Sequence, residues 1–267
     1  MSFDLIAAIR PYVLSTITSA YTGLNLAKYP RTGLRVLMYH AIGTSIENDT
    51  RSLYNIAPKK FKEHMRYLAE YYKNYLVPFD LSALEGNSLK IALTFDDGYR
   101  DNLTIAAPIL AELGIPFTIF ICTGAVAELK TGFLTPKDVR EMATLPGVRI
   151  GSHTISHTCL TECDDFQLNE ELIGSRSYLE DLIGVEVNLL SYPHGAVDIR
   201  VRNMAENAGY QIGATSRFDI NKYGRDPLLL CRTDIWAQDD LSTFKQKIQG
   251  DWDWNRWRST DPAKQPI

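Results

Sequence analysis

Short apolar runs alternate with longer amphipathic stretches along most of this chain, and no other feature of its 267 residues limits the fold as strongly. The runs have the length of buried strands and the longer stretches have a helical period, which together predict a βα-repeating fold with parallel strands. We expect strands at 36–40, 75–77, 91–95, 117–121, 148–151, 189–192, 211–215 and 228–232. We expect helices at 58–73, 101–113, 136–144, 165–183, 198–208 and 240–249. Asp101 is placed to cap the second helix, and Gly114 and Gly184 stand where helices should end.

No Gly/Ser linker or low-complexity stretch divides the chain, so we expect one barrel domain over residues 31–250. Residues 1–30 form a predicted N-terminal amphipathic helical segment, too polar for a membrane span and without the basic start of a signal peptide. We favour packing of this helix on the domain; the alternative is a peripheral membrane or partner contact through 1–28. Residues 251–267 form a Trp-rich tail. Together with Trp236, its tryptophans either pack onto the domain, which we favour, or offer a stacking surface for sugar rings.

The charge balance excludes one class of partner. A formal net charge of −4 with singly scattered Lys and Arg lacks the basic patch that nucleic acid requires. The four cysteines are unevenly spaced in a chain large enough to bury a core, so we expect reduced thiols and a cytoplasmic protein. Cys159 and Cys163 lack a second pair that would complete a structural zinc site.

Polar residues follow several predicted strands at the point where each strand ends. They are His40, the pair Asp96 and Asp97, His153, His194 and Asp234. Active sites of α/β folds collect at the carboxyl ends of the strands. Convergence from five strands indicates the mouth of a barrel more than the single crevice of an open sheet.

Two of these strand ends carry a pattern typical of a metal site. Asp96 and Asp97 are adjacent, so that one carboxylate can bind a metal while the other stays free as a base; the structural alternative is a cap of backbone N–H groups. His153 and His157 are four residues apart, which on a helix would place both imidazoles on one face. Two His and one Asp leave coordination positions open, as catalytic metal sites do.

Three successive motifs resemble those of the polysaccharide deacetylases, the NodB-homology group also called carbohydrate esterase family four. They are T-F-D-D-G-Y at 94–99, H-T-I-S-H at 153–157 and Y-P-H-G at 192–195, within an ordered match over about 34–235. V-L-M-Y-H at 36–40 also resembles the first strand of members that act on poly-N-acetylglucosamine. The resemblance implies a distorted (β/α) barrel of seven or so parallel strands and an N-acetylated carbohydrate substrate.

The resemblance also implies roles for individual residues. Asp97, His153 and His157 match the metal ligands, usually for Zn²⁺, with Co²⁺, Ni²⁺ or Mn²⁺ as alternatives. Asp96 matches the general base, and the backbone N–H of His194 matches the group that helps to stabilise the oxyanion. The remaining candidates for contact with the substrate or oxyanion are Tyr99, Tyr192, Pro193 and Gly195.

Two departures from the family pattern concern the catalytic machinery. Many members have an Arg where this chain has Ser191, and Arg232 resembles the later Arg that holds the catalytic Asp in other subfamilies. No histidine follows His194, so the usual late His acid is missing. The acid is then His40, the side chain of His194, or solvent.

The predicted function is therefore metal-dependent removal of N-acetyl groups from amino sugars, in the building or tailoring of a polysaccharide such as an exopolysaccharide. The alternatives are an amidohydrolase acting on a non-polymeric or non-sugar amide, and a carbohydrate-binding pseudoenzyme with the same fold.

Overall fold

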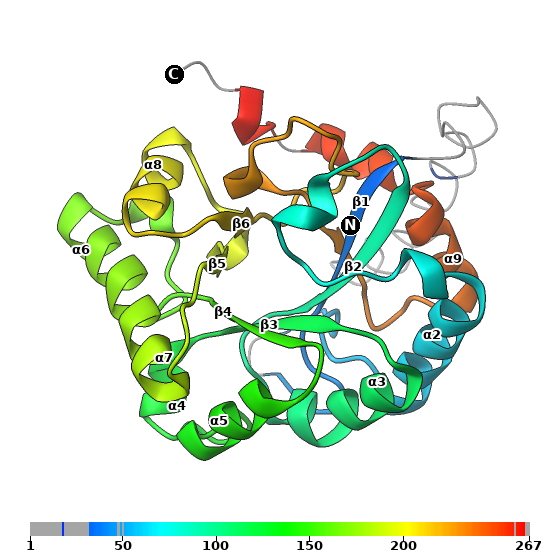
Figure 1. Cartoon of the computed structure of the whole chain (residues 1–267), viewed down its shortest axis with the longest axis horizontal. Helices are drawn as coiled ribbons and strands as arrows, with labels where there is room; N and C mark the ends of the chain where they lie inside the picture. Colours follow the sequence, from blue (N-terminus) through cyan, green and yellow to red (C-terminus); the bar gives the residue numbers. More distant parts are fainter. Residues whose placement is uncertain (1–17, 19–31, 47–48, 50, 259, 265–267) are drawn as a thin grey trace, which may run out of the picture.

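The computed structural model describes residues 18, 32–46, 49, 51–258 and 260–264. Seven parallel strands form one sheet in the order β6-β5-β4-β3-β2-β1-β7, which curls into a half-barrel (Figure 1). This confirms the predicted parallel barrel. The strands are β1 (Gly33–Tyr39), β2 (Leu89–Phe95), β3 (Phe117–Ile121), β4 (Val148–Ser152), β5 (Leu189–Ser191), β6 (Ile212–Ala214) and β7 (Thr233–Asp234).

Helices lie around the outside of the curled sheet (Figure 1). They are α2 (Pro58–Tyr71), α3 (Ala107–Leu113), α4 (Thr123–Ala127), α5 (Pro136–Thr144), α6 (Asp165–Asn169), α7 (Ser175–Ile183), α8 (Ile199–Asn207) and α9 (Leu241–Gln249). π-helical turns at Asn102–Ala106 and Glu170–Gly174 extend α3 and join α6 to α7, which completes the predicted helices at 101–113 and 165–183.

The sheet separates two apolar layers, as the alternation of side chains along a strand requires. Leu34 and Val36 of β1 belong to a small cluster inside the barrel. Leu37 and Tyr39 belong to the large cluster between the strands and the helices. The inner layer is small because polar side chains take over toward the carboxyl ends of the strands, where the site lies.

Two predicted strands need correction, and one helix was missed. The predicted strand at 228–232 begins instead as a 3-10 turn, Pro227–Leu229, because Pro227 starts the turn and Asp226 caps it. Leu230 then forms an isolated parallel bridge to Ala214 of β6, one edge strand of the sheet, before β7 pairs with β1 as the other edge strand. The strand at 75–77 is only a bridge at Leu76, and α4 was not predicted.

Asp101 does not cap its helix. Its carboxylate instead accepts the N–H groups of Ile42 and Thr44, both at 2.8 Å, and so holds the loop that follows β1. Gly114 and Gly184 do end helices as predicted, each in the left-handed conformation that favours glycine.

The C-terminal tail packs against the barrel. Trp252 and Trp254 are buried with Phe218 and contact the partly buried Trp236, which confirms the packing interpretation for these three tryptophans. For Trp257, which is 63% exposed, the packing interpretation is wrong. A buried ion pair joins Arg35 of β1 to Asp253 at 2.7 Å. The N-terminal segment 1–30 lies outside the described residues except for Thr18, whose hydroxyl accepts from the Trp254 indole. None of the described helices combines the length and hydropathy that a membrane span needs.

Candidate metal centre and catalytic pocket

A cavity of about 800 Å³ opens at the carboxyl ends of the strands. All the polar residues predicted to converge there line it: His40 after β1, Asp96 and Asp97 after β2, His153 after β4, His194 after β5 and Asp234 in β7. Parallel strands carry their carboxyl ends to one edge of the sheet, so the convergence follows from topology. The predicted convergence of these residues at the barrel mouth is confirmed.

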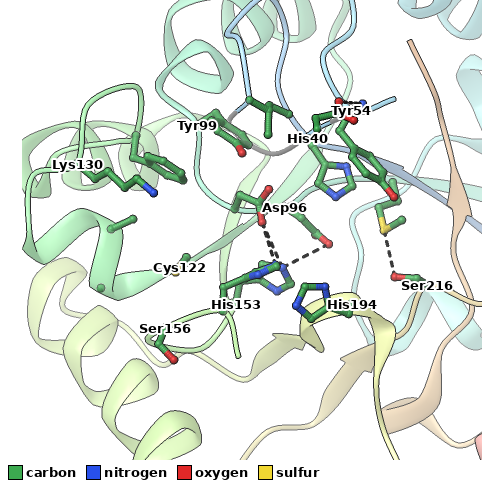
Figure 2. A pocket seen from close by; sticks show the side chains of 18 of the residues that line it. His40, Tyr54, Asp96, Tyr99, Cys122, Lys130, His153, Ser156, His194 and Ser216 are labelled. Atoms are coloured by element: carbon green, nitrogen blue, oxygen red, sulfur yellow. Dashed lines mark hydrogen bonds and ion pairs between the residues drawn. The ribbon is translucent and has the colours of Figure 1, made fainter. Parts of the chain in front are cut away.

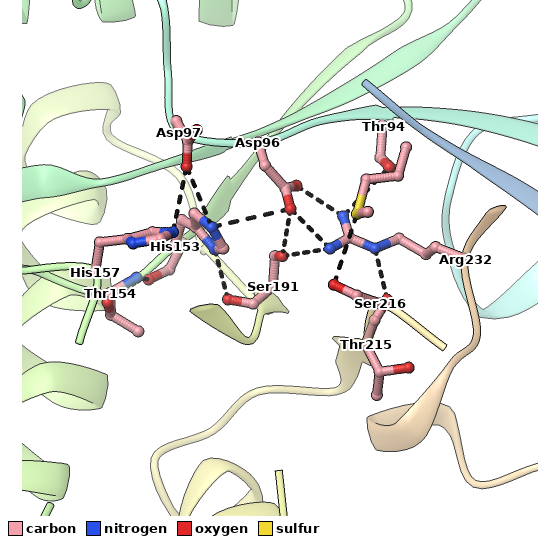
Figure 3. Close-up of polar contacts among 12 residues, drawn as sticks. Thr94, Asp96, Asp97, His153, Thr154, His157, Ser191, Thr215, Ser216 and Arg232 are labelled. Atoms are coloured by element: carbon pink, nitrogen blue, oxygen red, sulfur yellow. Dashed lines mark hydrogen bonds and ion pairs between the residues drawn. The ribbon is translucent and has the colours of Figure 1, made fainter. Parts of the chain in front are cut away.

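Asp97, His153 and His157 form a group within this cavity that could hold a metal ion (Figure 3). Asp97 Oδ1 lies 3.5 Å from His153 Nε2 and 3.4 Å from His157 Nε2. Ligands about 2.1 Å from a tetrahedrally coordinated ion are separated by about 3.4 Å. The two distances from Asp97 match this spacing, and all three donor atoms lie within 4.8 Å of one another, close enough for one divalent cation to bind all three.

The backbone around this group is locally strained. Asp97, Thr154, His157 and His194 have φ values of 74°, 66°, 58° and 59°, in the left-handed region that non-glycine residues rarely adopt. Such strain concentrates at functional sites because the surrounding structure must maintain it. The left-handed turn at Asp97 separates its carboxylate from that of Asp96. The segment from His153 to His157 is a loop, so the predicted helical presentation of the two imidazoles is wrong.

Hydrogen bonding orients the His153 ring, and burial keeps the His157 ring neutral. His153 Nδ1 donates to the Ser191 carbonyl at 2.8 Å, which leaves Nε2 as the ring nitrogen that faces Asp97. Burial lowers the pKa of His153, but Asp96 and Asp97 outweigh burial and the net direction is upward. Burial and the neighbouring His153 lower the pKa of His157 to about 4, so this ring is neutral at pH 7.

Asp96 lies beside the metal group but is held by other partners (Figure 3). Arg232 donates to both of its carboxylate oxygens at 2.7 Å, and Ser191 Oγ donates to Oδ2 at 3.0 Å. Arg232 also donates to Ser191 Oγ at 2.8 Å and to the Thr215 carbonyl at 2.9 Å. Burial raises the pKa of Asp96, but Arg232 and then His153 reverse this, and the carboxyl stays ionised. The predicted contact of Arg232 with Asp96 is confirmed, and Ser191 joins it.

The Y-P-H-G element contributes backbone and the His194 side chain to the cavity. Gly195 and Ala196 donate their N–H groups to the carbonyls of Tyr192 and Pro193, whereas the N–H of His194 has no partner within the described part of the chain. The His194 ring packs edge-on against the His157 ring at 4.6 Å. The side chains of Tyr192 and Pro193 are buried away from the cavity, with the Tyr192 hydroxyl donating to the Leu228 carbonyl.

His40 and His194 both project into the cavity (Figure 2). His40 Nδ1 and Asp234 Oδ1 are both buried without a hydrogen-bond partner among the described residues. Burial raises the pKa of Asp234 to about 6, and the charge of His40 is the main opposing effect. His64, in contrast, is fully buried under Phe244 and lies outside the cavity.

The walls of the cavity come from loops whose role the sequence did not reveal. Tyr99 stacks on Phe133 at 4.8 Å, with the Lys130 ammonium 5.3 Å from the Phe133 ring. Tyr54, from the loop after β1, packs against His40 at 4.5 Å. Tyr54, Lys130 and Phe133 belong to none of the motifs, and only their position beside the strand ends connects them to the site. The stack places Tyr99 in the cavity as predicted.

Comparisons with known proteins agree with this geometry. The family model described as polysaccharide deacetylase matches residues 84–213. YxkH of Bacillus subtilis, whose name places it among polysaccharide deacetylases, is 31% identical over 188 residues, covering 68% of this chain and 64% of that protein. A chitooligosaccharide deacetylase of Rhizobium leguminosarum is 34% identical over 97 residues, covering 36% of this chain and 41% of that protein.

A solved structure is also similar. The Streptococcus pyogenes deacetylase PplD, in complex with acetate, has a TM-score of 0.71 and 24% identity, covering 81% of this chain and 98% of that chain. This likeness shows the fold. The chain spans less than two thirds of the length of both curated relatives.

Proposed function

The chain belongs to the polysaccharide deacetylase family, and from this we propose that it is a divalent-metal-dependent hydrolase that removes acetyl groups from the nitrogen of amino sugars. One observation carries the proposal. The three residues that could hold a metal ion, Asp97, His153 and His157, share a cavity with Asp96, whose buried carboxylate is not part of that group. A structural metal site would need no such second carboxylate. Acetate and a free amine are the expected products.

A divalent cation at the three donors would supply a Lewis acid that activates water and polarises the amide carbonyl. Asp96 is the proposed general base. The two hydrogen bonds from Arg232 fix its position, and burial beside the donor group brings it within reach of a water in the cavity. The unpartnered N–H of His194 is the proposed donor to the oxygen that becomes negative in the transition state.

The proposed general acid is His40, which would protonate the leaving nitrogen. An amine leaves an amide only with a proton, so the acid must lie across the cavity from the base. His40 lines the cavity and has Asp234 beside it as a counter-charge. His194 is less suitable because its ring packs on the metal-ligand side, against His157. In this proposal His40 takes the role for which no histidine after residue 194 is present.

We propose an N-acetylglucosamine oligomer or polymer as the substrate and zinc as the metal. The family implies an acetylated carbohydrate, and a similar protein is named for chitooligosaccharides. The stacked rings of Tyr99 and Phe133 provide an apolar wall on which a sugar face can pack. Two imidazoles and one carboxylate form a donor set that suits zinc, with cobalt, nickel or manganese as substitutes.

The test measures acetate release from N-acetylglucosamine oligomers by the protein as purified, after chelation, and after return of zinc or cobalt. We expect release that disappears with the chelator and returns with the metal. Asp96→Asn should abolish turnover but leave zinc binding intact. Glu112→Gln, an exposed carboxylate of α3 far from the cavity, is the control.

Two results would contradict the proposal. Oligomer binding without acetate release, unchanged in Asp96→Asn, would support a carbohydrate-binding protein. Metal-dependent acetate release from simple acetamides, with none from sugars, would support an amidohydrolase with a different substrate.

A further inference from the structure

The Asp234 carboxylate is hydrogen-bonded through only one of its two oxygens among the described residues. Trp236 Nε1 donates to Asp234 Oδ2 at 2.6 Å, while Oδ1 has no hydrogen-bond partner among the described residues. Asp234 is 7% exposed and lines the same cavity as His40. The direction in which its free oxygen points therefore depends on the Trp236 indole.

The Trp236 indole is held in turn by Lys247 of α9. The Lys247 ammonium lies 3.6 Å from the centre of the Trp236 ring and 5.3 Å from that of Trp252. It donates to the Asp234 carbonyl at 2.8 Å and forms an ion pair with Asp239. Asp239 also accepts the backbone N–H of Trp236 at 2.8 Å. One ammonium group thus contacts the backbone of Asp234, the ring that orients its carboxylate, and the anion that anchors that ring.

Stability alone does not explain a lysine at this position. Lys247 is fully buried, and burial lowers its pKa while Asp239 opposes the shift. Taking an ammonium out of water is costly, and replacing a buried ion pair with apolar side chains of similar volume is often neutral or stabilising. The aromatic surroundings of Phe218, Trp236 and Trp252 would accept a methionine. What a methionine could not do is donate hydrogen bonds toward Asp234.

We propose that Lys247 is a positioning residue for the acid side of the reaction: it fixes Asp234 and Trp236 so that the free carboxylate oxygen of Asp234 faces His40. This inference rests on the proposed function, because it assigns Lys247 to the step in which His40 protonates the leaving nitrogen. Lys247 does not touch the substrate. Its effect reaches the reaction only through Asp234.

The experiment compares two substrates with different needs for an acid. An N-acetylglucosamine oligomer must lose an amine and needs the acid, whereas 4-nitrophenyl acetate loses a stable phenolate without protonation. Lys247→Met and Trp236→Phe should each lower kcat for the oligomer about tenfold or more, with KM nearly unchanged, and leave the chelator-sensitive ester activity within about twofold of wild type. His40→Asn and Asp234→Asn should each lower kcat for the oligomer at least as much, because they remove the proposed acid and its counter-charge directly.

The outcomes separate this inference from the proposed function. Equal losses on both substrates, or no change in the amide-to-ester ratio of either variant, would overturn the role of Lys247 while leaving the deacetylase intact. Absence of metal-dependent activity in wild type would instead overturn the proposed function. Trp236→Phe keeps an aromatic ring over Lys247 but loses the donor to Asp234, so it tests the geometry even if Lys247→Met fails to fold.

Discussion

Replacing Arg232 with methionine removes the cation that neutralises Asp96 while keeping much of the apolar stem. The two side chains are 0% and 3% exposed, and both contacts measure 2.7 Å. The substitution also removes the donors to Ser191 Oγ and the Thr215 carbonyl. Leaving one partner of a buried pair uncompensated costs about 3–5 kcal/mol. We expect a fall of that size in the free energy of unfolding, and a fall in Tm on the order of 10 °C.

Urea unfolding in the presence of a chelator measures this loss without a contribution from bound metal. Arg200→Met is the matched control, since Arg200 pairs with Asp165 at the same 2.7 Å but with side chains 36% and 79% exposed. An exposed pair contributes less than about 1 kcal/mol. Both variants lose one positive charge, so the difference between their losses in free energy of unfolding measures the effect of burial.

The double variant Asp96→Asn, Arg232→Met gives a sharper test. The double variant removes the buried Asp96 carboxylate that would otherwise lack its cation, so it should be more stable than Arg232→Met alone. The interaction energy between the two substitutions should be about 1–3 kcal/mol. Two results would refute the reasoning: a loss in Arg232→Met no larger than in Arg200→Met, or additive losses in the double variant. Either would mean that Asp96 finds other solvation once Arg232 is gone.

Four further predictions concern single positions. Burial lowers the pKa of His64 from 6.5 to about 4, so the neutral ring contributes fully to the free energy of unfolding above pH 6.5, and this contribution is lost as the pH falls toward 4. The loss should reach about 3 kcal/mol, and His64→Leu should flatten this part of the pH dependence measured by urea unfolding. Ser191→Ala should lower the free energy of unfolding by about 1–2 kcal/mol, because it removes one hydrogen bond to Asp96 and one from Arg232. Gly195→Ala should lower the free energy of unfolding in urea more than Gly184→Ala does. Both glycines have positive φ, but only at Gly195 would the new Cβ lie 2.6 Å from Ser216 N. Equal losses in the two variants would show that the loop at Gly195 moves to make room. Zinc at 100 times its Kd should stabilise the wild type by about 2.7 kcal/mol in thermal unfolding, and a similar gain in His157→Ala would exclude His157 as a ligand.

Local sequence patterns were sufficient for most of the architecture. The strands that became β2, β3 and β4 and the helices that became α2 and α5 lie within one or two residues of the predictions at most ends. These elements carry strong periodicity and clear ends, such as Pro136 at the start of α5 and the Thr135 cap before it. The failures are short elements: α4 and the turn at Pro227–Leu229 contain too few residues to establish a period.

The sequence by itself determined which residues could bind a metal and at which strand ends they stand, because motif spacing and strand order are properties of the chain. Only the tertiary structure decided how they are presented. Left-handed backbone at Asp97 and His157 aims the donors, and Arg232 reaches Asp96 across 136 positions of sequence. Asp234 is likewise oriented by Trp236 and Lys247 through packing against α9. Such contacts depend on which surfaces the barrel brings together, and no local pattern records a partner that is distant in sequence.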